Sequence, residues 1–345
     1  MEPDVTLGDV ARLAGVHPST ASRALNETTR KLVKAATAER VLAAATTLGY
    51  KPNYLARSFK TRRTLSIGVV IPDINNPLFP PMVRGVEDRL AAAGYIALLA
   101  NVDGDAAREQ RIFDELTTRQ VDGLVLATAR RDDPRLIGLA RQGIPMVLIN
   151  RVVDDHAFSS VSVDDVAAIR LVVDHLAALG HRRIAHVAGP QQLSTGYGRY
   201  RGFLSAMEAN GLEVDPRLVF FAAGFSIAEG ERCGGELVGI DSPPTAVVAA
   251  NDMLALGCYG ALDHSELDCP SQVSIVGFND MPFIDRMSPP LTTVRIPAYD
   301  IGFQAAELMV GRIRRPDSPL KVLLLAPRLV VRSSTAPPPP GSPLT

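Results

Sequence analysis

The feature that most constrains the fold is an alternation, from Leu65 onward, of short apolar runs with helical segments. Continuous apolar runs are typical of strands buried on both faces, and their alternation with helices predicts parallel sheets covered on both sides. Two series of similar length, divided near Val163, indicate two similar lobes. The runs are 65–72, 95–101, 122–128, 144–150, 183–189, 246–251 and 273–279.

The charge distribution separates a small N-terminal module from this body. Residues 1–63 contain 11 Lys and Arg against 5 Asp and Glu, a balance of +6, whereas the rest contains 25 against 32, a balance of −7. Phosphate neutralisation supplies much of the affinity of proteins for DNA, so this local balance matters more than the net charge of −1. The basic module is therefore a candidate for DNA binding.

Two short helices joined by a tight turn are predicted within residues 6–25. Thr6 and Asp9 form a capping-box pattern at the start of the first helix. Gly15 suits the left-handed conformation of the turn, and Pro18 suits the first position of the second helix. An ordinary helical hairpin with a solvated polar face is the alternative interpretation of this segment.

Neighbouring segments favour a DNA-binding headpiece over that alternative. The second helix carries Ser22 and Arg23 on its polar face, as a recognition helix in the major groove would. A third amphipathic helix is predicted over 35–48, ended by Gly49. A short helix capped by Asn53 then leads into the body.

The chain closely resembles the lactose-repressor (LacI/GalR) family of bacterial transcription regulators, along nearly its whole length. VTLGDVARLAGVHPSTASRALN at 5–26 and LGYKPNYLARSFKTRRT at 48–64 are the most specific parts of the resemblance. It implies an N-terminal all-α helix-turn-helix headpiece with a hinge helix, followed by an α/β two-lobed domain like the periplasmic binding proteins. It also implies a homodimer that binds a palindromic operator, as a repressor, under the control of a small effector such as a sugar or sugar derivative.

The resemblance places DNA contacts along the headpiece and the hinge. Arg23 is the strongest base reader, because its guanidinium can bond both acceptors of a guanine. Phe59 takes the place of the leucine that the family wedges into the minor groove; packing on the sensor domain is its alternative. The expected DNA-binding residues are Thr6, Pro18, Ser19, Thr20, Ser22, Arg23, Asn26, Asn53, Leu55, Ala56, Arg57 and Phe59.

Two departures from the family pattern affect helix caps. His17 stands where the family usually has a serine that caps the recognition helix, so a weaker cap is expected there. Lys34 replaces another serine cap at the third helix. The expected domains are a headpiece at 1–52, a hinge helix and linker at 53–63, an effector-binding and dimerisation domain at 64–335 (N-lobe 64–163 plus 297–325, C-lobe 164–296 plus 326–335), and a disordered Pro/Ser-rich tail at 336–345.

The second set of candidate residues lies where the predicted parallel strands end, which is where ligands of such sheets bind. Amides and carboxylates bond hydroxyl groups, and aromatic rings cover the apolar face of a sugar, so a polyhydroxylated ring fits this set. Several of these positions match places where relatives hold effector. The expected effector-binding residues are Phe79, Asp103, Asn150, Arg151, Arg199, Phe225, Asn251 and Asn279.

Each of these residues has a simpler interpretation as a helix cap or turn former, and only their shared location favours a ligand. Asp252 in particular is expected to cap the helix that it begins. Asn279 stands where the family usually has an aspartate, which leaves open a ligand other than a simple hexose.

No catalytic residues, metal ligands or cofactor site are expected from the sequence. The six histidines show no metal-binding spacing, and the three cysteines are widely spaced. With neither a signal peptide nor a membrane span predicted, we expect a cytoplasmic protein that makes no membrane contact. A sugar-transport binding protein and a sugar-modifying enzyme are the alternatives; the first does not need the basic module, and the second lacks a catalytic constellation.

Overall fold

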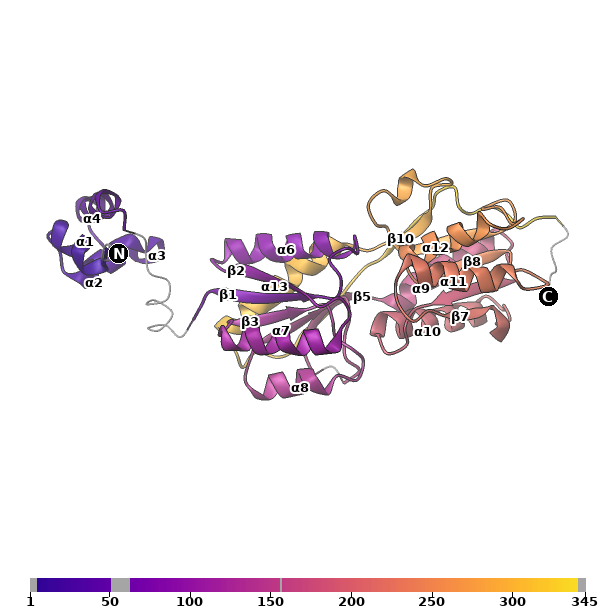
Figure 1. Ribbon diagram of the computed structural model, residues 1–345, viewed down its shortest axis with the longest axis horizontal. Coiled ribbons are helices and arrows are strands. Elements are labelled where there is room, and N and C mark those ends of the chain that lie inside the picture. Colours follow the sequence, from indigo (N-terminus) through magenta and orange to yellow (C-terminus); the bar gives the residue numbers. More distant parts are fainter. Residues whose placement is uncertain (1–4, 51–62, 156, 341–345) are drawn as a thin grey trace. The chain divides into compact units, whose positions relative to one another are not determined.

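The computed structural model describes residues 5–50, 63–155 and 157–340, which divide into two units, 1–64 and 65–345 (Figure 1). The first unit is all-α and the second contains two α/β lobes with mostly parallel sheets, so the predicted fold class is confirmed. The predicted hinge residues lie outside the described residues: Asn53, Leu55, Ala56, Arg57 and Phe59.

Four helices make up the described part of the first unit, and three of them enclose a core built largely of alanine and valine. Small side chains such as Ala11 and Ala21, both fully buried, let the helices cross closely. A fourth, short helix between the second and third was not predicted. The helices are α1 (Leu7–Leu13), α2 (Pro18–Leu25), α3 (Glu27–Arg30) and α4 (Ala35–Thr47).

The helix ends in this unit follow the local sequence. Thr6 and Asp9 form the predicted capping box, and Gly15 has the predicted left-handed backbone, with φ of +62°. His17 does cap α2, because its imidazole Nδ1 accepts a hydrogen bond from the Ser19 amide at 3.2 Å. Lys34 provides no side-chain cap to α4.

The second unit contains two six-stranded sheets, and corresponding strands occupy corresponding places in the two. In the N-lobe the order is β11-β5-β4-β3-β1-β2, and in the C-lobe it is β12-β10-β9-β8-β6-β7. The N-lobe strands are β1 (Ser66–Ile71), β2 (Ile96–Asn101), β3 (Gly123–Leu126), β4 (Met146–Ile149), β5 (Ser159–Val163) and β11 (Val322–Leu325). The C-lobe strands are β6 (Ile184–Ala188), β7 (Val219–Phe221), β8 (Ala246–Ala249), β9 (Ser274–Asn279), β10 (Thr292–Arg295) and β12 (Arg328–Val330).

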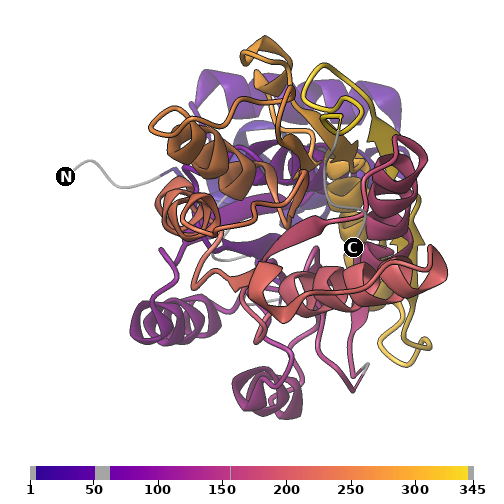
Figure 2. The ribbon, with the colours of Figure 1, turned by 90° about the vertical axis from the view of Figure 1, so that its right-hand side faces the viewer.

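Helices cover both faces of each sheet, which explains why the central strands are apolar throughout. In the N-lobe, α6 and α13 pack together on one face, and α7 and α8 cover the other (Figure 1). In the C-lobe, α9 and α10 cover one face and α11 and α12 the other (Figure 2). The helices are α6 (Phe79–Ala92), α7 (Ala106–Thr118), α8 (Pro134–Arg141), α9 (Asp165–Ala178), α10 (Ser194–Ala209), α11 (Ile227–Val238), α12 (Asp252–Leu262) and α13 (Ala298–Arg314).

The closest helix pair in each lobe crosses at glycines. A Cβ on Gly302 of α13 would lie 1.9 Å from the Met82 carbonyl oxygen of α6, and one on Gly85 would lie 2.1 Å from a carbonyl oxygen of α13. In the C-lobe, Gly230 of α11 and Gly257 of α12 are equally tight, with 2.3 Å and 2.2 Å to the facing carbonyl oxygens. Both crossings therefore depend on the absence of a side chain.

The chain passes between the lobes three times. It goes from β5 into α9 through Asp164, from β10 into α13 through residues 296–297, and from β11 into β12 through residues 326–327. Each lobe is therefore assembled from segments distant in the sequence.

The chain is held to the C-lobe up to Ala336, the first residue of the expected disordered tail. Ser334 is fully buried, where its hydroxyl donates to the Ile275 carbonyl at 2.6 Å and accepts from the Thr292 amide at 2.7 Å. Farther on, the carbonyl oxygen of Ala336 lies 2.9 Å from Nε2 of His181. A Pro/Ser-rich composition suggests disorder, but these hydrogen bonds hold the segment to the C-lobe as far as Ala336.

Candidate functional site

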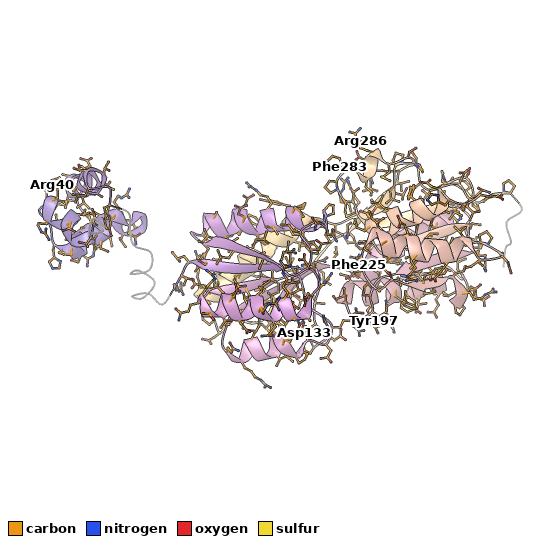
Figure 3. The ribbon with its side chains drawn as sticks, viewed as in Figure 1. Arg40, Asp133, Tyr197, Phe225, Phe283 and Arg286 are labelled. Carbon is orange, nitrogen blue, oxygen red and sulfur yellow. The ribbon has the colours of Figure 1, made fainter. Side chains whose placement is uncertain are left out.

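A cleft lies where the two lobes meet, at the carboxyl ends of the parallel strands. Seven of the eight predicted effector residues line it, together with three that were not predicted. Figure 3 labels Phe225, one of the predicted residues, at the boundary between the lobes. The lining consists of Asn76, Leu78, Phe79, Asn150 and Arg151 from the N-lobe and Thr195, Arg199, Phe225, Asn251 and Asn279 from the C-lobe.

Four polar atoms of the lining are buried without a hydrogen-bond partner in the described structure. They are Asn150 Oδ1, Arg151 Nε, Thr195 Oγ1 and Asn279 Oδ1. Leaving a buried donor or acceptor unsatisfied costs about 1–3 kcal/mol, so native proteins keep such groups mainly for a purpose. Since both lobes contribute to this set, the cleft is suited to a polar ligand that bonds both lobes at once.

The two asparagines occupy equivalent places in the two sheets. Asn150 follows β4 with φ of +62°, and Asn279 ends β9 with φ of +120°. Both values lie in the region that non-glycine residues rarely adopt, although asparagine tolerates its left-handed part better than most. The backbone at both strand ends is therefore specialised to aim an amide at the cleft.

Arg199 is held rigidly by groups of its own lobe. Its Nε donates to Asp165 at 2.8 Å, and one terminal nitrogen donates to the Ala250 carbonyl oxygen at 2.6 Å. The guanidinium lies over the Phe278 ring, 3.7 Å from the centroid, and 5.9 Å from that of Phe225. Burial raises the pKa of Asp165, and the charge of Arg199 opposes that shift.

The aromatic walls of the cleft fit against small residues. A Cβ on Gly189 would lie 2.4 Å from the Phe225 ring, so the loop after β6 has room for this ring only because position 189 is a glycine. Phe79, on the opposite lobe, is almost fully buried at the start of α6. The two rings thus provide apolar surface beside the polar lining.

Two sequence assignments need correction. Asp103 lies outside the lining, because its carboxylate bonds Asn101 at 2.5 Å and also Arg108. Asp252 does not cap α12, since Asn251 does so by accepting from the Leu254 amide at 2.9 Å.

Asp252 instead ties α12 to two neighbouring segments of the C-lobe. It is fully buried and accepts hydrogen bonds from the Met281 amide at 2.8 Å and the Thr293 hydroxyl at 2.6 Å. Burial raises the pKa of this carboxyl to about 6. Its role is therefore to support the fold behind the cleft.

Three lining residues were not among the predicted effector contacts. Asn76 and Thr195 are polar and follow predicted strands, so their position was visible, but nothing distinguished them from ordinary turn formers. Leu78 is apolar, and nothing in the sequence indicated that it lines a ligand site.

One side of the cleft is bordered by direct contacts between the lobes. Arg131 of the N-lobe lies 3.5 Å over the Tyr197 ring and donates to the Gln191 carbonyl oxygen at 3.3 Å, both in the C-lobe. An ion pair with Asp154 at 2.8 Å holds this arginine in place. Figure 3 marks Tyr197 at this contact. Any change in the angle between the lobes must break or rearrange it.

A larger, open groove on the outer surface of the N-lobe lies between α7 and α8. Thr117 and Arg135 are among its lining, and all of its residues come from one lobe. Arg135 is already paired with Glu109 and Asp133. The cleft between the lobes, with its converging unpartnered atoms, is therefore the better ligand site.

The predicted DNA-reading residues lie on or next to α2. Pro18, Ser19, Ser22 and Arg23 are exposed, whereas Thr20 is half-buried. Asn26, at the C-terminal cap of α2, is also half-buried, and Thr6 is exposed at the start of α1. The exposed side chains on α2 present a surface with a positive charge and several hydrogen-bonding groups.

None of the helices among the described residues is long and apolar enough to cross a membrane. No group of three or more His, Cys, Asp or Glu among those residues is arranged to hold a metal ion.

Comparison with known proteins identifies both parts of the chain. Residues 6–53 match "Bacterial regulatory proteins, lacI family", and residues 173–335 match "Periplasmic binding protein-like domain". The chain is 32% identical to the HTH-type transcriptional repressor CytR of Escherichia coli strain K12 over 335 residues, which are 97% of each protein.

Solved structures agree with this assignment. The lac repressor dimer bound to operator and the anti-inducer ONPF matches with a TM-score of 0.85 and 27% identity, over 97% of this chain and 100% of that one. The transcriptional regulator CelR in complex with cellobiose matches with a TM-score of 0.74 and 33% identity, over 96% and 99%. The chain therefore belongs to the lacI family of bacterial regulatory proteins and is a DNA-binding transcription regulator under ligand control, not an enzyme.

Proposed function

We propose that the cleft between the lobes binds a small polyhydroxylated effector, a sugar or sugar derivative, and that this binding changes the affinity of the headpiece for its operator. The observation that carries the proposal is the convergence of four unpartnered buried polar atoms from both lobes on one cleft. The bound cellobiose of CelR supports a sugar-like ligand.

A ligand that bonds both lobes stabilises one relative orientation of them over others. Its effect on DNA binding then equals its difference in affinity for the two orientations. The contact of Arg131 with Tyr197 joins the lobes, so such a change would act on it. We infer that effector control passes through the angle between the lobes.

On the DNA side, we propose that a homodimer places α2 of each chain in the major groove of a palindromic operator in the cytoplasm. The exposed Pro18, Ser19 and Arg23 would read bases, while Thr20, Ser22 and Asn26 would hold the backbone. The lac repressor dimer bound to its operator supports this arrangement. Thr6 and the predicted hinge residues complete the proposed interface.

One experiment tests both halves of this proposal. Purified protein is used to enrich genomic fragments, and the recovered site is then titrated with protein in the presence of sugars, sugar derivatives and nucleosides. We expect a palindrome and at least one compound that shifts the operator affinity. Failure to enrich any palindrome would contradict the proposed DNA-binding mode.

A variant of the recognition helix sharpens the DNA test. Arg23→Ala should relax specificity at one base pair of each half-site, at a cost of about 1–3 kcal/mol, because a bidentate contact to guanine is lost. Arg12, exposed on α1, provides a control in Arg12→Ala. A uniform loss across all sequences would instead make Arg23 a phosphate contact.

A further inference from the structure

Arg151 stands apart from the other arginines around the cleft. It follows β4 and lines the cleft, and its buried Nε has no hydrogen-bond partner. No carboxylate of the described residues forms an ion pair with its guanidinium. By contrast, Arg199 is paired with Asp165, and Arg131 is paired with Asp154. The N-lobe wall of the cleft thus carries a cation that has no ion pair within the described residues, although the charge of Glu109 is close enough to act on it.

This charge persists at neutral pH. Burial, together with the nearby charge of Arg199, lowers the pKa of Arg151 to about 10, and Glu109 opposes that shift. A group with this pKa is still protonated at pH 7. Because a buried charge without a partner is unfavourable, the surroundings of Arg151 favour a negatively charged group.

The start of α10 adds to the positive potential of the cleft. Thr195 occupies the second position of this helix and lines the cleft, and the helix has no side-chain cap. Its Oγ1 is one of the buried atoms without a partner. An uncapped helix N-terminus carries a partial positive charge and free backbone amides, which bind anions.

None of the ten described residues that line the cleft is acidic. Both Asn150 and Asn279 present amides, and the carboxylate of Asp165 behind them is occupied by Arg199. A site for a neutral sugar gains from carboxylates, which accept hydrogen bonds from hydroxyl groups. This lining instead offers two guanidinium groups, amides and a helix N-terminus.

We propose that the effector carries an oxyanion, as in a phosphorylated sugar or a sugar acid, and that this group pairs with Arg151 between the lobes. This inference rests on the proposed function, in which the cleft holds the effector. The amides of Asn150 and Asn279 then bond the hydroxyl groups, and the Phe225 ring covers the apolar face of the ligand.

Matched pairs of ligands test the charge. Calorimetric titration of the full chain would compare D-ribose with D-ribose 5-phosphate, and D-glucose with D-glucose 6-phosphate and D-gluconate, within a panel that includes nucleosides and inorganic phosphate. We expect an anionic member to bind at least about tenfold more tightly than its neutral parent, an advantage that rising salt reduces. The phosphate and carboxylate arms show which oxyanion the site takes.

Two variants assign the effect to Arg151. Arg151→Gln should remove about tenfold to hundredfold of the affinity for the anionic ligand while leaving the neutral parent within about threefold. Arg170→Gln removes the same charge from an exposed site on α9 and should change neither. Without ligand, Arg151→Gln should melt no lower than the parent protein, because it removes an unpaired charge.

The outcomes separate this inference from the proposed function. If compounds bind but every neutral parent binds as tightly as its anion, the charge inference is overturned and the effector cleft stands. If Arg151→Gln melts well below the parent while Arg170→Gln does not, Arg151 is a structural residue and the inference also fails. If no member of the panel binds or shifts operator affinity, the effector function itself is contradicted.

Discussion

The two lobes share a strand order and a helix crossing at glycines, but they differ in the contacts that hold the arginine at the cleft. The C-lobe holds Arg199 with a carboxylate, a carbonyl oxygen and an aromatic ring, whereas the N-lobe leaves Arg151 without a partner. The edge strands differ too, since β11 pairs with β5 in parallel and β12 pairs with β10 antiparallel. In the proposed site, the C-lobe thus provides a prearranged half, and the N-lobe provides the half that an anionic ligand would complete.

The largest effect is expected from breaking the prearranged half. Arg199→Ala leaves the buried Asp165 without its counter-ion, which should destabilise the C-lobe by about 3–5 kcal/mol in thermal or urea unfolding. The double variant Arg199→Ala with Asp165→Asn should recover part of that loss. If the single variant unfolds like the parent, the C-lobe does not depend on this pair and the contrast between the lobes disappears.

The shared helix crossing is tested by matched glycine substitutions. Gly302→Ala in the N-lobe and Gly230→Ala in the C-lobe should each destabilise the protein by up to about 3 kcal/mol, because the new methyl group meets backbone. Gly311 and Gly235 lie on the same two helices in open space, so alanine there should stabilise the protein by up to about 1 kcal/mol. Equal effects at tight and open positions would refute the packing argument.

Acid should act on the C-lobe first. Burial lowers the pKa of His186 from 6.5 to about 4, because this imidazole is enclosed in the core and stacked on Phe203. The unfolded chain takes up the proton near pH 6.5 and the folded one only near pH 4. This contribution to stability is therefore complete above pH 6.5 and is lost as the pH falls toward 4.

Between pH 7 and pH 5 the loss amounts to about 2 kcal/mol, measured as the change in unfolding free energy. His186→Gln should reduce this pH dependence, to which His175 and His181 also contribute because burial lowers their pKa values. His264→Gln, an exposed control, should retain it. The described N-lobe contains no histidine. An unchanged slope in His186→Gln would assign the acid sensitivity to other groups.

The smallest effect is expected at the contact between the lobes. Arg131→Ala removes the stacking on Tyr197 and the bond to Gln191, which together contribute about 1 kcal/mol to one orientation of the lobes. Effector affinity should change by about fivefold while the melting temperature stays close to that of the parent. Arg108→Ala, at a surface ion pair, is the control. An identical affinity in both variants would show that this contact does not bias the orientation.

The sequence predicted those parts of the fold that local patterns determine. All seven apolar runs are strands, because strands buried on both faces need continuous apolar residues. Five strands were missed: β5, β7, β10, β11 and β12. Two of them, β5 and β10, are rich in buried serine and threonine, and the hydroxyls of Ser159, Thr292 and Thr293 find partners in the fold. Such satisfaction of polar groups by distant segments leaves no local signal.

The same limit explains the errors at the candidate site. Asp103 follows a strand just as Asn150 does, but a neighbouring arginine occupies its carboxylate. Asp252 and Asn251 are adjacent, and only tertiary geometry decides which of them caps α12. The unpaired state of Arg151 could not be predicted at all, because it depends on which groups are missing around it in space.

The three passages of the chain between the lobes also bear on how the protein is made. The N-lobe receives α13 and β11 only after the whole C-lobe sequence up to Arg295 has been synthesised, and the C-lobe receives β12 still later. Neither lobe can complete its sheet on the ribosome before nearly the last segment emerges, whereas the described headpiece helices end at Thr47. A chain that ends after residue 296 would thus lack segments of both lobes but would keep helices α1 to α4 of the headpiece.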